Sequence, residues 1–84
     1  MISFEGAGWD DYLYWQQTDK AILKKINNLI RDIGRDPFDG IGKPEQLKQN
    51  LSGYWSRRIT DEHRIVYLMD GDDIIIAQCR GHYD

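Results

Sequence analysis

The sequence predicts an α+β fold in which a short N-terminal strand and two helices precede a C-terminal antiparallel β-sheet, with both helices packed on one face of that sheet. Two observations carry this prediction. Apolar residues recur at helical spacing between residues 20 and 33, whereas residues 54–80 contain three runs rich in β-branched and aromatic residues, separated by short polar turns. A chain of 84 residues has the size of one small domain, so residues 1–84 are assigned to a single domain.

The chain is predicted to begin with a strand and a helix. Residues 2–4 alternate as a short strand, and residues 5–8, with two glycines, break it. The helix that follows has aromatic residues at helical spacing and ends near Gln17. Asp10 and Asp11 are expected in its first turn, where the helix dipole favours anions.

A longer second helix is predicted between Thr18, a good N-cap, and Gly34, a typical C-terminal stop. Its apolar residues form a single stripe: Ile22, Ile26, Leu29, Ile30 and Ile33. The basic residues of this helix lie mostly off the stripe, which is typical of a solvated face. The loop of residues 34–44, rich in Gly and Pro, then joins the two halves of the domain.

The second half of the chain is predicted to form the sheet. Residues 44–50 fit either a turn of helix or a short strand, and strands are expected at residues 54–60, 63–69 and 73–80. Their connections are short enough for antiparallel hairpins. Helices on one face leave the other face of such a sheet available for a site.

Composition narrows the possible classes of protein. The formal net charge is −3, and Cys79 is the only cysteine, so no intramolecular disulfide can form and a reducing compartment, the cytoplasm, is expected. Neither a signal peptide nor a membrane span is recognisable. No zinc-ligand set or phosphate-binding glycine loop is present, so no cofactor is expected. Cys79 itself is interpreted as a core residue.

A basic cluster stands out against this acidic background. Residues 43–58 contain four basic residues and a single acid, Glu45. Tyr54 and Trp55 lie beside Arg57 and Arg58, and aromatic rings next to cations can stack on bases. This mixture indicates a nucleic-acid site whose affinity comes from a local patch and not from net charge.

The segments KPEQLK, LSGYWSRRITDEHRIVY and the terminal CRGHY resemble the YoeB toxin family within the RelE superfamily. WDDYLYW and DPFDGIGKPE extend the likeness over nearly the whole chain. The resemblance implies a RelE-like, microbial-RNase-like fold. It also implies a toxin of a bacterial toxin–antitoxin pair that cuts mRNA in the ribosomal A site and is neutralised by a YefM-type antitoxin.

Metal-independent RNA cleavage needs a base for the 2′-OH, cations for the phosphate and an acid for the 5′-oxygen. Glu45, Arg64 and His82 are the respective candidates. Judged from the residues alone, Glu45 also fits a solvated loop carboxylate, and His82 also fits a residue of a frayed tail. The resemblance assigns Glu45 to acid–base catalysis, His82 to the general acid and Tyr83 to substrate contact.

Further cations are candidates for binding RNA phosphates: Lys43, Lys48, Arg58 and Arg80. Arg58 and Arg64 flank a turn, and strand alternation limits their arrangement. A two-residue loop turns them to opposite faces, whereas a three-residue loop of residues 61–63 places both on one face; function favours the second. Arg57, of opposite parity, is expected to pack elsewhere or to pair with an acid. His63 is interpreted as structural.

Two partners besides mRNA are expected. The aromatic residues of the first helix (Trp9, Tyr12 and Trp15) predict a homodimer, and the basic face suits the acidic tail of an antitoxin. Asp84 extends the chain past Tyr83 and adds a carboxylate that favours the charged form of His82. The alternatives to this enzyme are a ribosome-binding inhibitor without catalysis and a ribosome-independent ribonuclease.

Overall fold

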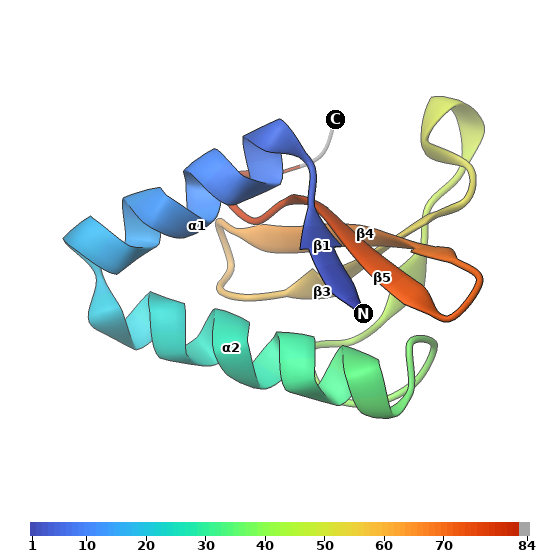
Figure 1. The fold of residues 1–84 in the computed structure, drawn as a ribbon, viewed down its shortest axis with the longest axis horizontal. Helices are drawn as coiled ribbons and strands as arrows, with labels where there is room; N and C mark the ends of the chain where they lie inside the picture. Colours follow the sequence, from blue (N-terminus) through green and yellow to red (C-terminus); the bar gives the residue numbers. More distant parts are fainter. Residues whose placement is uncertain (83–84) are drawn as a thin grey trace.

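A five-stranded mixed sheet carries both helices on one of its faces (Figure 1). The structure, a computed structural model, describes residues 1–82. Its elements follow one another as β1 (Ile2–Phe4), α1 (Gly6–Thr18), α2 (Lys20–Arg35), β2 (Glu45–Gln46), the 3₁₀ helix η1 (Gln49–Leu51), β3 (Tyr54–Arg58), β4 (Arg64–Asp70) and β5 (Asp73–Gln78). The predicted α+β class and the order of its elements are confirmed.

The strand order is β1-β5-β4-β3-β2, and β1 pairs with β5 in parallel while the other neighbours are antiparallel. The sheet is therefore mixed, although the three long strands form the predicted antiparallel meander. Parallel pairing of β1 is possible because the two helices separate it from the meander and supply the long crossover that parallel strands need. The ambiguous segment of residues 44–50 contains both predicted forms, since β2 is a short strand and η1 a helical turn.

The core lies between the helices and the sheet. The apolar stripe of α2 is confirmed, because Ile26, Leu29 and Ile33 are buried and Ile22 and Ile30 pack at the margin of the same cluster. The sheet contributes three fully buried residues to the cluster, Ile65, Tyr67 and Ile76, and Ile59, directly after β3, adds a fourth. Within the described residues, neither helix is long and apolar enough to cross a membrane.

The predicted caps of the second helix were wrong. Asp19, not Thr18, is the N-cap of α2, and its carboxylate accepts hydrogen bonds from the backbone N–H groups of Ala21 and Ile22, both at 3.1 Å. Thr18 still belongs to α1. At the other end, α2 continues through Gly34 to Arg35. The helix stops there because Asp36 precedes a proline, and a residue in that position is biased towards extended backbone.

The two glycines of residues 5–8 predicted a break, but the first helix already starts at Gly6 and includes Gly8. A glycine is needed at position 8 because a Cβ there would clash with the backbone carbonyl of Ile76. Gly8 therefore permits close packing of α1 on β5 and does not break the chain. Contrary to the prediction, Asp10 and Asp11 both lie beyond the first turn, and the Asp11 carboxylate accepts a hydrogen bond from the backbone N–H of Cys79 at 3.0 Å.

Gly8→Ala should destabilise the protein, because the added methyl group forces α1 away from β5. Overpacking of this kind typically costs about 1 to 3 kcal/mol. Equilibrium unfolding in urea measures the loss. Gly6→Ala is the matched control, since a Cβ at Gly6 meets no atom within 4 Å. Equal stability of the two variants would contradict the close contact of α1 and β5.

Candidate active site

Successive side chains of β3 point to opposite faces of the sheet, and Arg57 shows which of these faces meets the helices. Its side chain is fully buried and contacts Asp32 of α2. Arg58 therefore points to the opposite face, here called the site face. Arg58 pairs with Arg64 across the β3–β4 ladder, and directly paired residues share a face. The prediction that both arginines lie on one face is confirmed.

The connection of this hairpin is longer than the predicted three-residue loop of residues 61–63. The ladder ends at the pair of Arg58 and Arg64, so residues 59–63 form the connection, and within it the backbone N–H of Ile59 donates to the carbonyl of His63 at 2.9 Å. The Thr60 hydroxyl oxygen accepts hydrogen bonds from the backbone N–H groups of Glu62 and His63. This local capping favours a tight turn.

Glu45 also lies on the site face. It pairs with Ser56, which is two residues from Arg58 and therefore has the same orientation. Diagonal neighbours on adjacent strands are about 7 to 8 Å apart, within the reach of a glutamate and an arginine that share one ligand. The Glu45 side chain is exposed. The sheet thus brings Glu45, Arg58 and Arg64 together from β2, β3 and β4.

His82 approaches the same end of the sheet from the C-terminal segment. Its Nε2 lies 3.2 Å from the carbonyl oxygen of Asp61, and a carbonyl only accepts, so Nε2 is the donor. Arg64 Nη1 donates to the same carbonyl at 3.3 Å. Arg58 Nη1 lies 3.9 Å from the Asp61 carboxylate. Arg58, Arg64 and His82 therefore meet around Asp61.

The guanidinium of Arg64 is oriented by this turn. Its Nη1 also donates to the carbonyls of Thr60 at 2.6 Å and His63 at 3.2 Å. All side-chain hydrogen bonds of Arg64 to residues 1–82 come from Nη1. The remaining N–H groups of the planar guanidinium are available to a phosphate.

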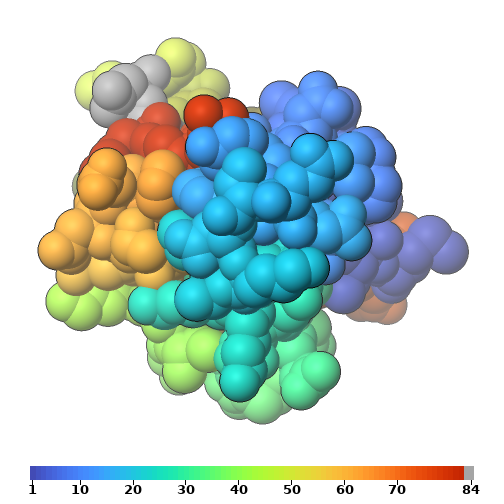
Figure 2. Space-filling view, turned by 90° about the vertical axis from the view of Figure 1, so that its left-hand side faces the viewer, coloured from blue at the N-terminus to red at the C-terminus, as the bar shows by residue number. Residues whose placement is uncertain are grey.

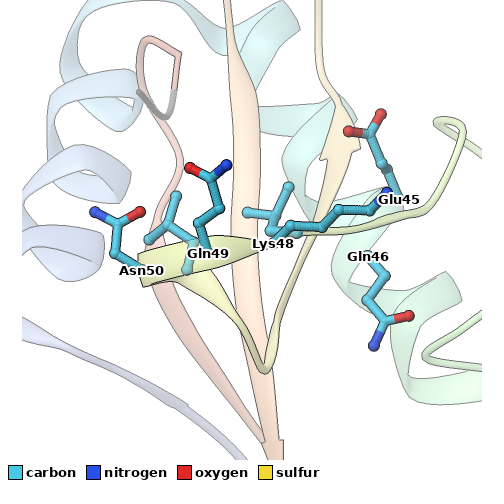
Figure 3. A pocket seen from close by; sticks show the side chains of 7 residues that line it. Glu45, Gln46, Lys48, Gln49 and Asn50 are labelled. Atoms are coloured by element: carbon cyan, nitrogen blue, oxygen red, sulfur yellow. The ribbon is translucent and has the colours of Figure 1, made fainter.

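Two further candidate cations line cavities near the site. Lys48 and Glu45 both line a cavity of about 380 Å³ formed by residues 45–51. Figure 3 shows Glu45 at one end of it, Asn50 at the other, and the Lys48 side chain extending towards the Glu45 end. Lys43, with a left-handed φ of 54°, lines a second cavity of about 360 Å³ together with Arg58 and Lys25.

Lys25 is one of the basic residues that the sequence places on the solvated face of the second helix. Helical periodicity places it off the apolar stripe but does not reveal that a distant loop brings Lys43 beside it.

Arg80 and Tyr83 are the other candidate site residues near the C-terminus. Arg80 lies with its guanidinium 3.6 Å from the centre of the Tyr14 ring on α1, a cation–π contact. Tyr83, like Asp84, lies outside the described residues.

Arg57 supports the site from beneath the sheet, and its predicted pairing with an acid is confirmed. Its Nη1 donates to Asp32 at 2.6 Å, and its Nε donates to the Tyr67 hydroxyl at 3.1 Å. It also binds three carbonyls of the loop before β2: Asp36, Asp39 and Ile41. A buried guanidinium with this many acceptors holds the loop that leads to Lys43 and Glu45.

Asp32 is expected to make stability depend on pH in the acid range. The hydrogen bond from Arg35, followed by those from the Ile41 backbone and Arg57, holds the pKa of Asp32 well below its ordinary value of 3.8. A lowered pKa gives stability that is fully present above the ordinary value and is lost as the pH falls from there through the lowered pKa. Asp32→Asn should therefore be less stable than the wild type near neutral pH, and the difference should shrink below 3.8.

Urea unfolding at several pH values measures this difference in free energy of unfolding. Asp10→Asn is the matched control for the loss of one exposed carboxylate. A difference between wild type and Asp32→Asn that stays constant down to strongly acid pH would contradict the role of the ionised carboxylate.

Cys79 is a core residue, as interpreted from the sequence. Burial, followed by the neighbouring Asp11 carboxylate, raises the pKa of its thiol to about 12. The thiol therefore stays protonated at neutral pH and is a poor nucleophile.

Comparison with known proteins places this chain in a family. The family of YoeB-like toxins of bacterial type II toxin–antitoxin systems matches residues 4–83. The toxin YoeB of Escherichia coli K12 is 68% identical over 75 residues, which are 89% of each chain.

Solved structures agree with this match. A YoeB/ParE toxin from Agrobacterium tumefaciens is 51% identical, with a TM-score of 0.95 over 98% of both chains. The heterotetrameric YoeB–YefM complex from Staphylococcus aureus has 52% identity and a TM-score of 0.92, covering 99% of this chain and 97% of the other. The YoeB dimer from Staphylococcus aureus has 53% identity and a TM-score of 0.90, covering 98% and 95%.

Proposed function

The chain belongs to the YoeB-like toxins of bacterial type II toxin–antitoxin systems, and from this premise we propose that it is a ribosome-dependent endoribonuclease that cuts mRNA in the ribosomal A site. The observation that carries the proposal is the gathering of Glu45, Arg64 and His82 towards one end of the site face. A carboxylate, a cation and an imidazole are the groups that metal-independent cleavage of RNA requires.

The reaction is an in-line attack of the 2′-oxygen on the adjacent phosphorus. The Glu45 carboxylate takes the proton of the 2′-OH as the P–O bond forms, while Arg64 holds the non-bridging oxygens on which negative charge develops. The His82 imidazole gives a proton to the departing 5′-oxygen. The products are a 2′,3′-cyclic phosphate, which water can open to a 3′-phosphate, and a 5′-OH.

The remaining candidates bind and orient the RNA. Lys48 lines the same cavity as Glu45 and so brings positive charge beside the proposed base, whereas Lys43 and Arg58 together line a second cavity. Tyr83 is proposed to contact the substrate. Arg80, stacked on Tyr14, serves to hold the C-terminal segment that carries His82.

We also propose a YefM-type antitoxin and a second copy of the chain as partners. The antitoxin proposal rests on the Staphylococcus aureus relative, which was solved as a complex with YefM. The dimer proposal rests on the YoeB dimer of the same organism and on exposed apolar residues of this chain, among them Trp9 at 46% and Ile2 at 43%. Trp15, which the sequence also assigned to this surface, is instead buried in the core. Sedimentation showing only monomer at micromolar concentration would contradict the dimer. Cleavage on ribosomes places the protein in the cytoplasm.

Expression of the chain alone, with primer-extension mapping of cuts, tests the proposed function. We expect growth arrest that a co-expressed YefM-type antitoxin relieves, cuts inside translated mRNA, and little cleavage of naked RNA, because the ribosome orients the substrate. Arrest without cuts would instead identify a non-catalytic ribosome-binding inhibitor. Equal cleavage of naked RNA would identify a ribosome-independent ribonuclease. Normal growth with abundant folded protein would contradict a toxin.

Lys48→Ala should weaken binding to the ribosomal complex more than it slows the chemical step. A phosphate contact acts partly through counterion release, so loss of one cation should reduce the slope of log affinity against log salt by about one. Binding titrations at several salt concentrations measure this slope. Lys20→Ala, an exposed lysine at the start of α2, is the matched control. An unchanged slope would contradict a phosphate contact at Lys48.

A further inference from the structure

The C-terminal segment that carries His82 is held by side chains from two separate elements. Helix α1 contributes Trp15, whose indole N–H donates to the Cys79 carbonyl at 2.8 Å, and Asp11, which accepts from the Cys79 N–H at 3.0 Å. In Figure 2 the red C-terminal segment lies next to both the blue α1 and the orange β3–β4 turn. Hydrogen bonds from α1 and from the β3–β4 turn therefore hold the segment after β5 in place.

The turn supplies the contacts closest to His82. The backbone N–H of Gly81 donates to Nδ1 of His63 at 2.8 Å, and the Gly81 carbonyl accepts from the backbone N–H of Arg64 at 3.0 Å. Gly81 adopts a left-handed φ of 77°, which L side chains rarely tolerate. Both backbone groups of the residue before His82 are thus bound to the hairpin that also carries Arg64.

The His63 ring is itself held in place. It packs edge-on against the Trp15 ring, with 4.8 Å between centres, and its backbone N–H is bound by the Thr60 hydroxyl. A backbone N–H can only donate, so Nδ1 of His63 is an unprotonated acceptor in this contact. The mechanism proposed above does not use this imidazole.

We propose that His63 is a positioning residue for the general acid: its Nδ1 fixes Gly81 and thereby places the His82 imidazole beside Arg64. The inference rests on the proposed function and deepens it. The Asp61 carbonyl, which accepts from both His82 and Arg64, is the point at which the two side chains are aligned. The leaving 5′-oxygen takes the place of this carbonyl as the acceptor of the His82 proton.

Substitutions at His63 test the proposal in single-turnover cleavage of a ribosomal complex with protein in excess. His63→Leu keeps an apolar contact with Trp15 but removes the acceptor, and it should slow cleavage about 10 to 10²-fold, since a small misplacement of a catalytic group has that cost. Affinity for the ribosomal complex should stay unchanged. His63→Asn offers an amide oxygen near the position of Nδ1 and should restore most of the rate.

His63→Gln is the control that separates loss of the Nδ1 acceptor from loss of folding. Its amide reaches the position of Nε2 and not that of Nδ1, so it should behave like the leucine variant while remaining polar. If the leucine variant fails to fold, the cleavage rates of the asparagine and glutamine variants still test whether an acceptor at the position of Nδ1 is needed. Equal rates for these two folded variants would overturn the proposal.

A double variant separates positioning from a general structural role. If His63 acts through His82, adding His63→Leu to His82→Ala should cause no further loss of rate. Losses that multiply, with an active wild type, would overturn this inference and leave the proposed function standing. A folded wild type that cuts no mRNA would overturn both.

Amide exchange of Gly81 gives a readout that needs no activity. Protection of the Gly81 N–H should be lost in His63→Leu and kept in His63→Asn, while protection of the β4 and β5 amides is unchanged. Retained protection of Gly81 in the leucine variant would show that another contact holds the segment, and it would overturn the proposal.

Discussion

Replacement of His82 by alanine is expected to slow cleavage of a bound A-site codon by about 10² to 10⁴-fold, the usual contribution of a general acid. The physical reason is that an alkoxide is a poor leaving group unless a proton reaches it as the P–O bond breaks. His82 Nε2 carries the proton that it now shares with the Asp61 carbonyl. Binding to the ribosomal complex should survive, because Arg64, Arg58 and the lysines remain.

A substrate with sulfur in place of the 5′-oxygen makes this test specific. A thiolate has a far lower pKa than an alkoxide and leaves without protonation, so wild type and His82→Ala should cleave it at similar rates. His63→Leu should be rescued in the same way if it acts through His82. An alanine variant that cleaves the normal substrate at the wild-type rate would exclude His82 as the acid.

Glu45→Gln is expected to cause a loss of similar size, about 10² to 10⁴-fold, because the amide keeps the shape of the side chain but cannot accept the 2′-OH proton. Single-turnover cleavage with a separate measurement of affinity is again the appropriate assay. Sulfur at the 5′-position should not rescue this variant, since deprotonation of the nucleophile remains unassisted. The thio substrate therefore distinguishes the base from the acid.

Glu5→Gln is the matched control for Glu45→Gln, because Glu5 is an exposed glutamate at the start of α1, away from the site face. It should cleave like the wild type. If Glu45→Gln also cleaved normally, the carboxylate would have no part in catalysis and water or another group would have to act as the base.

Local sequence patterns were sufficient for the elements whose signal lies within a few neighbouring residues. The apolar stripe of α2 and the three strands of the meander were predicted correctly, because burial of one helix face or one strand face imposes a fixed period. Local predictions failed where a residue type has two uses. Gly8 was interpreted as a breaker, yet the approach of β5 is what requires a glycine there.

Candidate site residues were recognisable from the sequence, but their arrangement was not. The basic cluster and the resemblance to a toxin family pointed to Glu45, Arg64 and His82 as residue types suited to RNA cleavage. By itself the sequence also determined that Arg57 and Arg58 point in opposite directions, since adjacent strand residues alternate. It left open whether Arg58 and Arg64 share a face.

Only the tertiary structure decided that question, because hairpin register depends on which loop residues the Thr60 hydroxyl caps and on how β3 pairs with β4. The same holds for His63 and Gly81, which are 18 residues apart in the chain and meet through one hydrogen bond. No local pattern reports such a contact. Residue types and periodicity are properties of the chain itself. The convergence of Glu45, Arg64 and His82 arises only when the strands pair and bring residues that are distant in the sequence together.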